Sequence, residues 1–392
     1  MTSPTVASVP PFLAGKSGQP AFAERFRFIK PTLPPIEATL ALYKSAYANG
    51  LITNSDLVSR FEQAAAERLG VKHTVAVSSC TCGQAMVLRA LDLKGEVIIP
   101  SFTFFATGHS VLWNNLTPVF ADCHPDTWTL DPADVERQIT PRTSAIIAVH
   151  MYGNPCDVEG LEALAAKYRL KLIFDSAHAF GSQHRGRAAG GFGDAEVFSL
   201  SPTKLLVAGE GGLVSTNDAT LAKGIQAARN YGDLGAYDPE VLGLSARMTE
   251  FNAALALAGL QIVDAKIKRH NEIAARYTSN LRDVPGLAFQ QVNKDDVCTY
   301  KDYSVLVDKE GFGLFRDELA AALLANNIET KKYFYPPLHR QHLYSKYYRP
   351  AEAPLTYTDF VSSSVLSLPI YESLPDETID RVTDAIRRLA GC

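Results

Sequence analysis

SAIIAVHMYGNPCDVEGLEALAAKYRLKLIFD, residues 144–175, is the stretch that decides the fold class of this 392-residue chain. The apolar runs at 144–149 and 171–175 have the length of buried strands. Between them, apolar residues at 158, 161, 164, 165 and 168 recur at the spacing of one helical face. A strand, a helix and a second strand in this order predict a parallel pair joined by a crossover helix.

The same alternation extends to both sides of this stretch. Strands are expected at 73–79, 96–100, 117–121, 144–149, 171–175, 196–200 and 213–216, and helices at 82–93, 104–116 and 157–168. This pattern predicts an α/β fold with a mostly parallel seven-stranded sheet flanked by helices. Ligands of such sheets bind beyond the carboxyl ends of the strands, so the residues that follow the strands are candidates for a site.

Two further helices are expected ahead of the sheet, at 36–49 and from about 56 to 69. Gly50 and Gly70 follow their ends, where glycine commonly closes a helix. Asn54 or Ser55 is positioned to cap the start of the second helix. Residues 249–281, after the sheet, predict one long or kinked helix that leads into a smaller unit.

The smaller unit is expected to contain strands at 302–307 and 364–368 and helices at 314–326 and 376–389. We therefore divide the chain into an N-terminal arm (1–30), a large α/β domain (31–262) and a small C-terminal α+β domain (263–392).

Composition excludes several classes of protein. A hydrophobic fraction of 46%, 20% charged residues and a net charge of −4 are ordinary globular values and point to neither nucleic acid nor an anionic membrane. The first 20 residues lack the pattern of a secretory signal, and no apolar run reaches the roughly 20 residues that cross a bilayer.

Six cysteines without a CxxC pair suit a reducing cytoplasm. Cys80-Thr81-Cys82 has no second ligand cluster, so we expect no metal.

The run FSLSPTKLLVAGEGG (198–212) carries the most informative residue, Lys204. Pyridoxal phosphate requires a lysine amine for its aldehyde, an anion for its ring nitrogen, donors for its phosphate and a flat group over its ring. Asp175 ends one expected strand, and Lys204 follows the next, so both can face one crevice. Taken alone, Lys204 is an ordinary exposed lysine and Asp175 a helix cap or turn residue.

Other strand ends supply the remaining groups. Ser199 and Ser201 are candidate phosphate ligands or ordinary strand and turn hydroxyls. Cys80 and Thr81, in the run SSCTCG (78–83), open a helix where amides would meet a phosphate or form a plain N-cap.

Phe104 and His178 complete the candidate set. Phe104 could stack on the ring or pack in the core, and His178 could reach the ring hydroxyl or be a hydrogen-bonded core histidine. A nicotinamide oxidoreductase would fit the same alternation. It would need a complete glycine fingerprint after the first strand, which residues 77–83 do not supply.

From about residue 28 onward the chain resembles the DegT/DnrJ/EryC1/StrS family of fold-type-I, pyridoxal phosphate-dependent aminotransferases. The resemblance rests on ordered matches: TPVFAD (117–122), VHMYG (149–153), DSAH (175–178), residues 199–212, RNYG (229–232), PPLH (336–339) and LP (368–369). It implies that Lys204 holds the cofactor, Asp175 pairs with the ring nitrogen, and Ser199 binds the phosphate together with Thr81. It also implies that Asn230 reaches the phosphate of a neighbouring subunit in a homodimer.

Two positions depart from the family pattern. His178 stands where many members have glutamine, so its charge could alter the electronics of the cofactor. Cys80 stands where glycine is common, so its backbone amide is the only ligand we carry over.

The resemblance also implies the reaction. Retention of Lys204 favours transamination, because the sugar 3-dehydratase branch of the family has histidine there. We expect transfer of an amino group from L-glutamate to a nucleotide-linked keto sugar, with C4 of a dTDP-4-keto-6-deoxyhexose as first choice. Amination at C3 or of a keto-cyclitol, and a non-catalytic regulator on the same fold, are the alternatives. Tyr335 and His339 are candidate substrate contacts in a loop that could equally be a proline-fixed surface loop.

Overall fold

The computed structural model of the chain describes residues 20–351 and 353–391, so most of the expected arm lies outside the described residues. Its main feature is a seven-stranded sheet in the order β1-β9-β8-β5-β4-β2-β3. The strands are β1 (His73–Val77), β2 (Glu96–Pro100), β3 (Thr117–Ala121), β4 (Thr143–Val149), β5 (Lys171–Asp175), β8 (Ala195–Ser199) and β9 (Gly212–Thr216). β8, β5, β4, β2 and β3 run parallel, whereas β9 is antiparallel to both of its neighbours. The expected mostly parallel sheet is confirmed.

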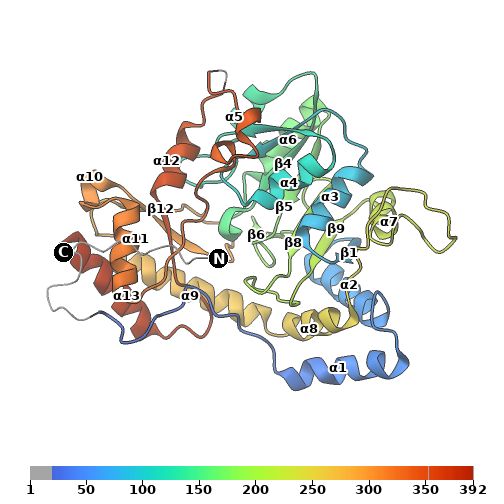
Figure 1. Cartoon of the computed structure of the whole chain (residues 1–392), viewed down its shortest axis with the longest axis horizontal. Coiled ribbons are helices and arrows are strands. Elements are labelled where there is room, and N and C mark those ends of the chain that lie inside the picture. Colours follow the sequence, from blue (N-terminus) through green and yellow to red (C-terminus); the bar gives the residue numbers. More distant parts are fainter. Residues whose placement is uncertain (1–19, 352, 392) are drawn as a thin grey trace.

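Helices cover both faces of the sheet (Figure 1). One face packs against α3 (Cys80–Ala90), α4 (Phe105–Trp113) and α7 (Ala219–Ala228). The other packs against α2 (Asp56–Leu69), α5 (Pro132–Gln138), α6 (Val158–Tyr168) and α8 (Glu250–Leu260). Burial on both sides explains why the central strands are apolar at successive positions. In β4, Ile146 belongs to one core cluster and Ile147 to the other.

The two helices ahead of the sheet end as expected. Gly50 and Gly70 close α1 (Ile36–Asn49) and α2 with φ angles of 71° and 66°, which glycine adopts without strain. The expected cap of α2 is corrected, because the Ser55 side chain makes no capping hydrogen bond. The fully buried carboxylate of Glu250, in α8, instead accepts the backbone N–H of Ser55 and of Leu57, each at 2.7 Å, and that of Val58 at 3.2 Å. This distant carboxylate ties α2 to α8.

The long helix expected at 249–281 is two helices, α8 and α9 (Val263–Leu281), separated at residues 261 and 262. In Figure 1, α9 extends from beneath the sheet to the C-terminal unit. That unit holds a three-stranded antiparallel sheet, β10 (Leu287–Phe289), β11 (Tyr303–Val307) and β12 (Val365–Leu368). Its helices are α10 (Lys309–Phe312), α11 (Arg316–Ala325), α12 (Thr356–Ser364) and α13 (Asp376–Ala390). The domain boundary at 262 stays a prediction.

Short elements complete the chain: β6 (Gln183–His184), β7 (Arg187–Ala188) and the 3-10 turns η2 (Met151–Gly153), η3 (Leu338–Arg340) and η4 (Ser345–Tyr347). The described part of the expected arm packs on the C-terminal unit, where Phe22 is buried and the N–H of Phe26 bonds to the carbonyl of Asn327. Within residues 20–351 and 353–391, no helix combines the length and apolarity required to span a membrane.

Candidate active site

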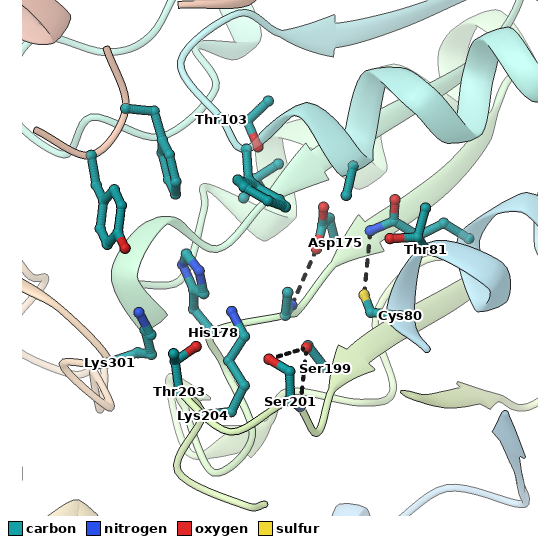
Figure 2. Close-up of a pocket in the computed structure, with 17 residues that line it drawn as sticks. Cys80, Thr81, Thr103, Asp175, His178, Ser199, Ser201, Thr203, Lys204 and Lys301 are labelled. Atoms are coloured by element: carbon teal, nitrogen blue, oxygen red, sulfur yellow. Dashed lines mark hydrogen bonds between the residues drawn. The ribbon is translucent and has the colours of Figure 1, made fainter. Parts of the chain in front are cut away.

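A cavity of about 230 Å³ opens beyond the carboxyl ends of β2, β4, β5 and β8, at the edge where parallel strands place their ligands. Eight of the candidates named from the sequence line it: Cys80, Thr81, Phe104, Asp175, His178, Ser199, Ser201 and Lys204. Figure 2 shows these side chains converging from separate strand ends. The topology therefore gathers a lysine, a carboxylate and several hydroxyls in one space.

Lys204 lies in the turn that follows β8, and its backbone N–H bonds to the Ser201 carbonyl at 3.0 Å. The side chain reaches the cavity and is half-buried. Burial lowers the pKa of its amine to about 8. The charge of Lys301 also lowers this pKa, whereas the nearby carboxylate of Asp302 raises it. A substantial fraction of the amine is therefore neutral, and so nucleophilic, near neutral pH.

Asp175 ends β5 as a buried, oriented carboxylate. One oxygen accepts the Thr107 hydroxyl at 2.7 Å and the other accepts the Ala177 N–H at 3.2 Å. Thr107 is in turn 3.0 Å from the hydroxyl of Thr103. These contacts hold the carboxylate in one orientation at the cavity wall.

His178 is neutral and has one defined tautomer. Burial, followed by the charges of Lys204 and Lys301, holds the pKa of its imidazole well below the usual value. Its Nδ1 accepts the backbone N–H of Tyr152 at 3.2 Å. The ring proton is therefore on Nε2, which makes His178 a single N–H donor.

The start of α3 forms one end of the cavity. The Ser79 hydroxyl caps this helix by accepting the Cys82 N–H at 3.2 Å. The first residue of β9, Gly212, lies against the backbone of Ser79 and Cys80 at the start of α3, and only glycine leaves room for this approach. A Cβ there would lie 2.5 Å from the Ser79 carbonyl carbon and 2.6 Å from the Cys80 nitrogen. Amides at a helix start, with hydroxyls beside them, are suited to a phosphate group.

Two hydroxyls and a thiol border this end of the cavity. The Ser199 and Ser201 hydroxyls lie 3.3 Å apart. Burial, and then the nearby Asp175, raises the pKa of the Cys80 thiol well above its usual value, so Cys80 is a neutral side chain.

Three candidates lie outside the cavity lining. The Asn230 amide donates to the Asp233 carbonyl at 3.1 Å. Tyr335 is 51% exposed and packs under the guanidinium of Arg316, 4.7 Å away. His339 is 1% exposed, and both of its ring nitrogens are engaged, one with Ser101 at 2.7 Å and one with Asp359 at 3.0 Å. The structure thus places His339 in a structural network.

The sequence interpretation missed several lining residues, among them Thr103, Thr203, Lys301, Tyr333 and Phe334. Phe334 directly precedes Tyr335, so the candidate loop reaches the cavity through the ring before the one that was named, and the role of Tyr335 as a substrate contact stays a prediction. Lys301 and Asp302 were detectable only as two charges at the start of an apolar strand.

The described groups match what pyridoxal phosphate requires: an amine of lowered pKa, a buried carboxylate and a helix start with hydroxyls, all in one cavity. Fold and site together define a fold-type-I pyridoxal phosphate enzyme. When bound, this cofactor supplies an electron sink for bond breaking at an amine-bearing carbon.

The chain belongs to the DegT/DnrJ/EryC1/StrS aminotransferase family, whose model matches residues 36–387. It is 33% identical over 356 residues to a dTDP-4-amino-4,6-dideoxy-D-glucose transaminase from Escherichia coli, covering 90% of this chain and 96% of that one. It is 35% identical over 322 residues to a UDP-N-acetyl-3-dehydro-alpha-D-glucosamine 3-aminotransferase from Acidithiobacillus ferrooxidans, covering 81% and 85%. The solved structure of DesI in the presence of its TDP-sugar product superimposes with a TM-score of 0.90 at 37% identity, covering 96% of each chain.

These matches confirm the family, fold class, enzyme class and cofactor expected from the sequence. The chain is a pyridoxal phosphate-dependent sugar aminotransferase. The interpretations as a nicotinamide oxidoreductase and as a regulator without activity are therefore set aside.

Proposed function

We propose that this enzyme transfers the amino group of L-glutamate to C4 of a dTDP-linked 4-keto-6-deoxyhexose. The observation that carries the proposal is the placement of Lys204, Asp175 and the start of α3 around one cavity. The choice of sugar is supported by two relatives, a transaminase named for dTDP-4-amino-4,6-dideoxy-D-glucose and the DesI structure with its TDP-sugar product.

Each group has a proposed role. Lys204 would hold the cofactor through its side-chain amine, and the same amine, when free, would move a proton to or from the donor carbon. Asp175 keeps the ring nitrogen protonated, and its bond from Thr107 supports that orientation. Thr81 and Ser199, with the Cys80 amide, bind the phosphate.

Two cavity side chains would contact the ring of the cofactor. Phe104 covers its face, supported by the contact of Phe104 with Phe334 at 5.9 Å between centroids. His178 donates Nε2–H to the ring oxygen.

We propose a homodimer as the working unit, with Asn230 reaching the partner's phosphate. Apolar side chains near Asn230 are unusually exposed, among them Tyr231 (58%), Tyr237 (98%) and Leu242 (70%). Tyr47, in α1, is 73% exposed. A second subunit would cover these residues. Cys80, Cys82, Cys123, Cys156 and Cys298 are all free, in keeping with a cytoplasmic enzyme.

A substrate panel tests the proposal. Purified enzyme is incubated with L-glutamate and dTDP-linked 4-keto, UDP-linked 3-keto and cyclitol ketones, and the aminated carbon is located by NMR. Fastest turnover of the dTDP-4-keto sugar with nitrogen at C4 is expected, and Lys204→Arg should lose both turnover and the visible absorption of the bound cofactor. Activity on a cyclitol ketone alone would contradict the nucleotide-sugar assignment.

Amination at C3 is the second candidate function. It is favoured by the 35% identity to the 3-aminotransferase from Acidithiobacillus ferrooxidans. The same panel separates the two, because the position of the new C–N bond is read directly.

A further inference from the structure

Lys301 is a second cation on the cavity wall. It lies two residues before β11 of the C-terminal unit, is only 5% exposed and lines the same cavity as Lys204. In Figure 2 it lies beyond Lys204, on the side away from Cys80 and Thr81. Lysine is rarely buried to this degree. The buried ammonium therefore needs an anionic partner, and its place on the cavity wall lets it contact a ligand.

Within the described residues, the Lys301 ammonium pairs with one carboxylate and also lies over the ring of Tyr333, 5.4 Å from its centroid. The Lys301 ammonium donates to both oxygens of Asp302, at 2.8 and 2.9 Å, and Asp302 is 1% exposed. No other hydrogen bond of this ammonium occurs within residues 20–351 and 353–391. An ammonium has three N–H groups, so Lys301 retains donor capacity toward the cavity.

Stability alone does not account for this pair. A buried ion pair commonly contributes no more than well-packed apolar side chains of similar volume, because both charges lose their hydration. The surroundings offer apolar alternatives, since Tyr333 and Phe334 line the same wall. A cation kept at a cavity wall, with a spare N–H, is suited to an anion that enters the cavity.

Two anionic reactants pass through this site. In an amino-acid donor, the α-carboxylate is attached to the carbon that bears the amine, and this carbon must come to the reaction centre beside Lys204. In a keto sugar, the diphosphate is separated from a C4 ketone by the hexose ring. A cation close to Lys204 therefore matches the carboxylate in position, whereas the proposed anion-binding start of α3 lies on the other side of the cavity (Figure 2).

We propose that Lys301 binds the α-carboxylate of the amino-acid donor, and that Asp302 is a positioning residue that holds and neutralises the ammonium when no donor is present. The proposal rests on the transamination function and adds the group that selects an amino acid as donor. Lys301 reaches the cavity from the C-terminal unit, so donor binding would join the two units across the site.

The test compares wild-type enzyme with Lys301→Gln/Asp302→Asn, which removes both charges with little change of shape. The KM of L-glutamate should rise roughly ten- to a hundredfold, the loss expected for one charge-assisted hydrogen bond, while the KM of the keto sugar stays within about twofold. A matched control is Lys94→Gln/Asp92→Asn, an exposed lysine–aspartate pair at 2.6 Å outside the cavity lining, which should change neither KM. An unchanged glutamate KM, or a raised sugar KM instead, would overturn the proposal.

A measurement on wild-type enzyme keeps the proposal testable if the double variant fails to fold. The α-amide of glutamate lacks only the α-carboxylate charge, and its efficiency as donor should be at least tenfold lower than that of glutamate. Equal efficiency of the two donors overturns the role of Lys301. Wild-type enzyme that aminates no keto sugar with any amino acid would instead refute the proposed function, so the two failures are distinguishable.

Discussion

The lowered pKa of Lys204 predicts the pH at which the cofactor-free enzyme captures pyridoxal phosphate. With a pKa of about 8, roughly one amine in ten is neutral at pH 7, against about one in three thousand at the ordinary value of 10.5. The neutral amine is the form that attacks the aldehyde. Burial thus raises the reactive fraction at pH 7 by roughly 300-fold.

The assay mixes cofactor-free enzyme with pyridoxal phosphate between pH 6 and 10 and follows the rate at which the visible absorption of the lysine-bound cofactor appears. Because the pKa is lowered, protonated Lys204 gives way to neutral amine as the pH rises through about 8. The rate should therefore rise about tenfold per pH unit at low pH and level off above about pH 9. A rate that keeps rising to pH 10, or that is flat throughout, would refute the reasoning.

Two variants identify the cause of the shift. Lys204→Ala should bind the cofactor without the lysine-dependent absorption. Lys301→Gln/Asp302→Asn removes a charge that lowers the pKa of Lys204 together with one that raises it, so the midpoint should stay near 8 if burial is the main cause. A midpoint that moves to about 10 in this variant would make Lys301 the dominant cause instead.

Three further changes probe the supports of the site. Glu250→Ala deletes the acceptor of three amides at the start of α2 and should lower the free energy of unfolding in urea by about 3 kcal/mol or more, with Glu250→Gln intermediate. Thr107→Val removes the 2.7 Å bond to Asp175 and should weaken cofactor affinity roughly tenfold by absorbance titration, whereas Thr107→Ser should not. Gly212→Ala places a methyl group 2.6 Å from the Cys80 nitrogen and should reduce cofactor affinity in a chain whose circular dichroism shows it to be folded; unchanged affinity would show that the start of α3 can shift freely.

The strands were predictable because their signal is local. Each strand of the seven-stranded sheet is a short apolar run between turn residues and lies within two residues of the expected range, whereas β6, β7 and β10, of two or three residues each, were not expected. The direction of β9 is not encoded locally, since an apolar run looks alike in parallel and antiparallel pairs. The same limit hid the cap of α2, because the carboxylate that supplies it stands at Glu250, far along the chain from Ser55.

The site residues show the same difference between what local sequence predicts and what tertiary packing decides. Residues at the carboxyl ends of sheet strands, such as Asp175 and Ser199, were identified because the parallel topology alone brings those ends together. Lys301 reaches the cavity only through the packing of the C-terminal unit on the sheet domain. The sequence likewise does not show where the His339 side chain turns: its loop approaches the site, whereas its ring nitrogens contact Ser101 and Asp359, so its role as a substrate contact stays a prediction.

The structure explains how histidine can stand at position 178, where many family members have glutamine, without bringing a charge to the cofactor. From sequence alone, an imidazolium at this point could have altered the electronics of the cofactor. Burial and the two cations, Lys204 and Lys301, make that charged form unfavourable. The Tyr152 amide then occupies Nδ1, so the side chain offers a neutral N–H donor, a kind of group that a glutamine amide also provides. The two lysines that serve the reactants thus also keep His178 neutral, and removing the Lys301 charge alone should raise the pKa of His178, a change that NMR of its imidazole nitrogens would detect.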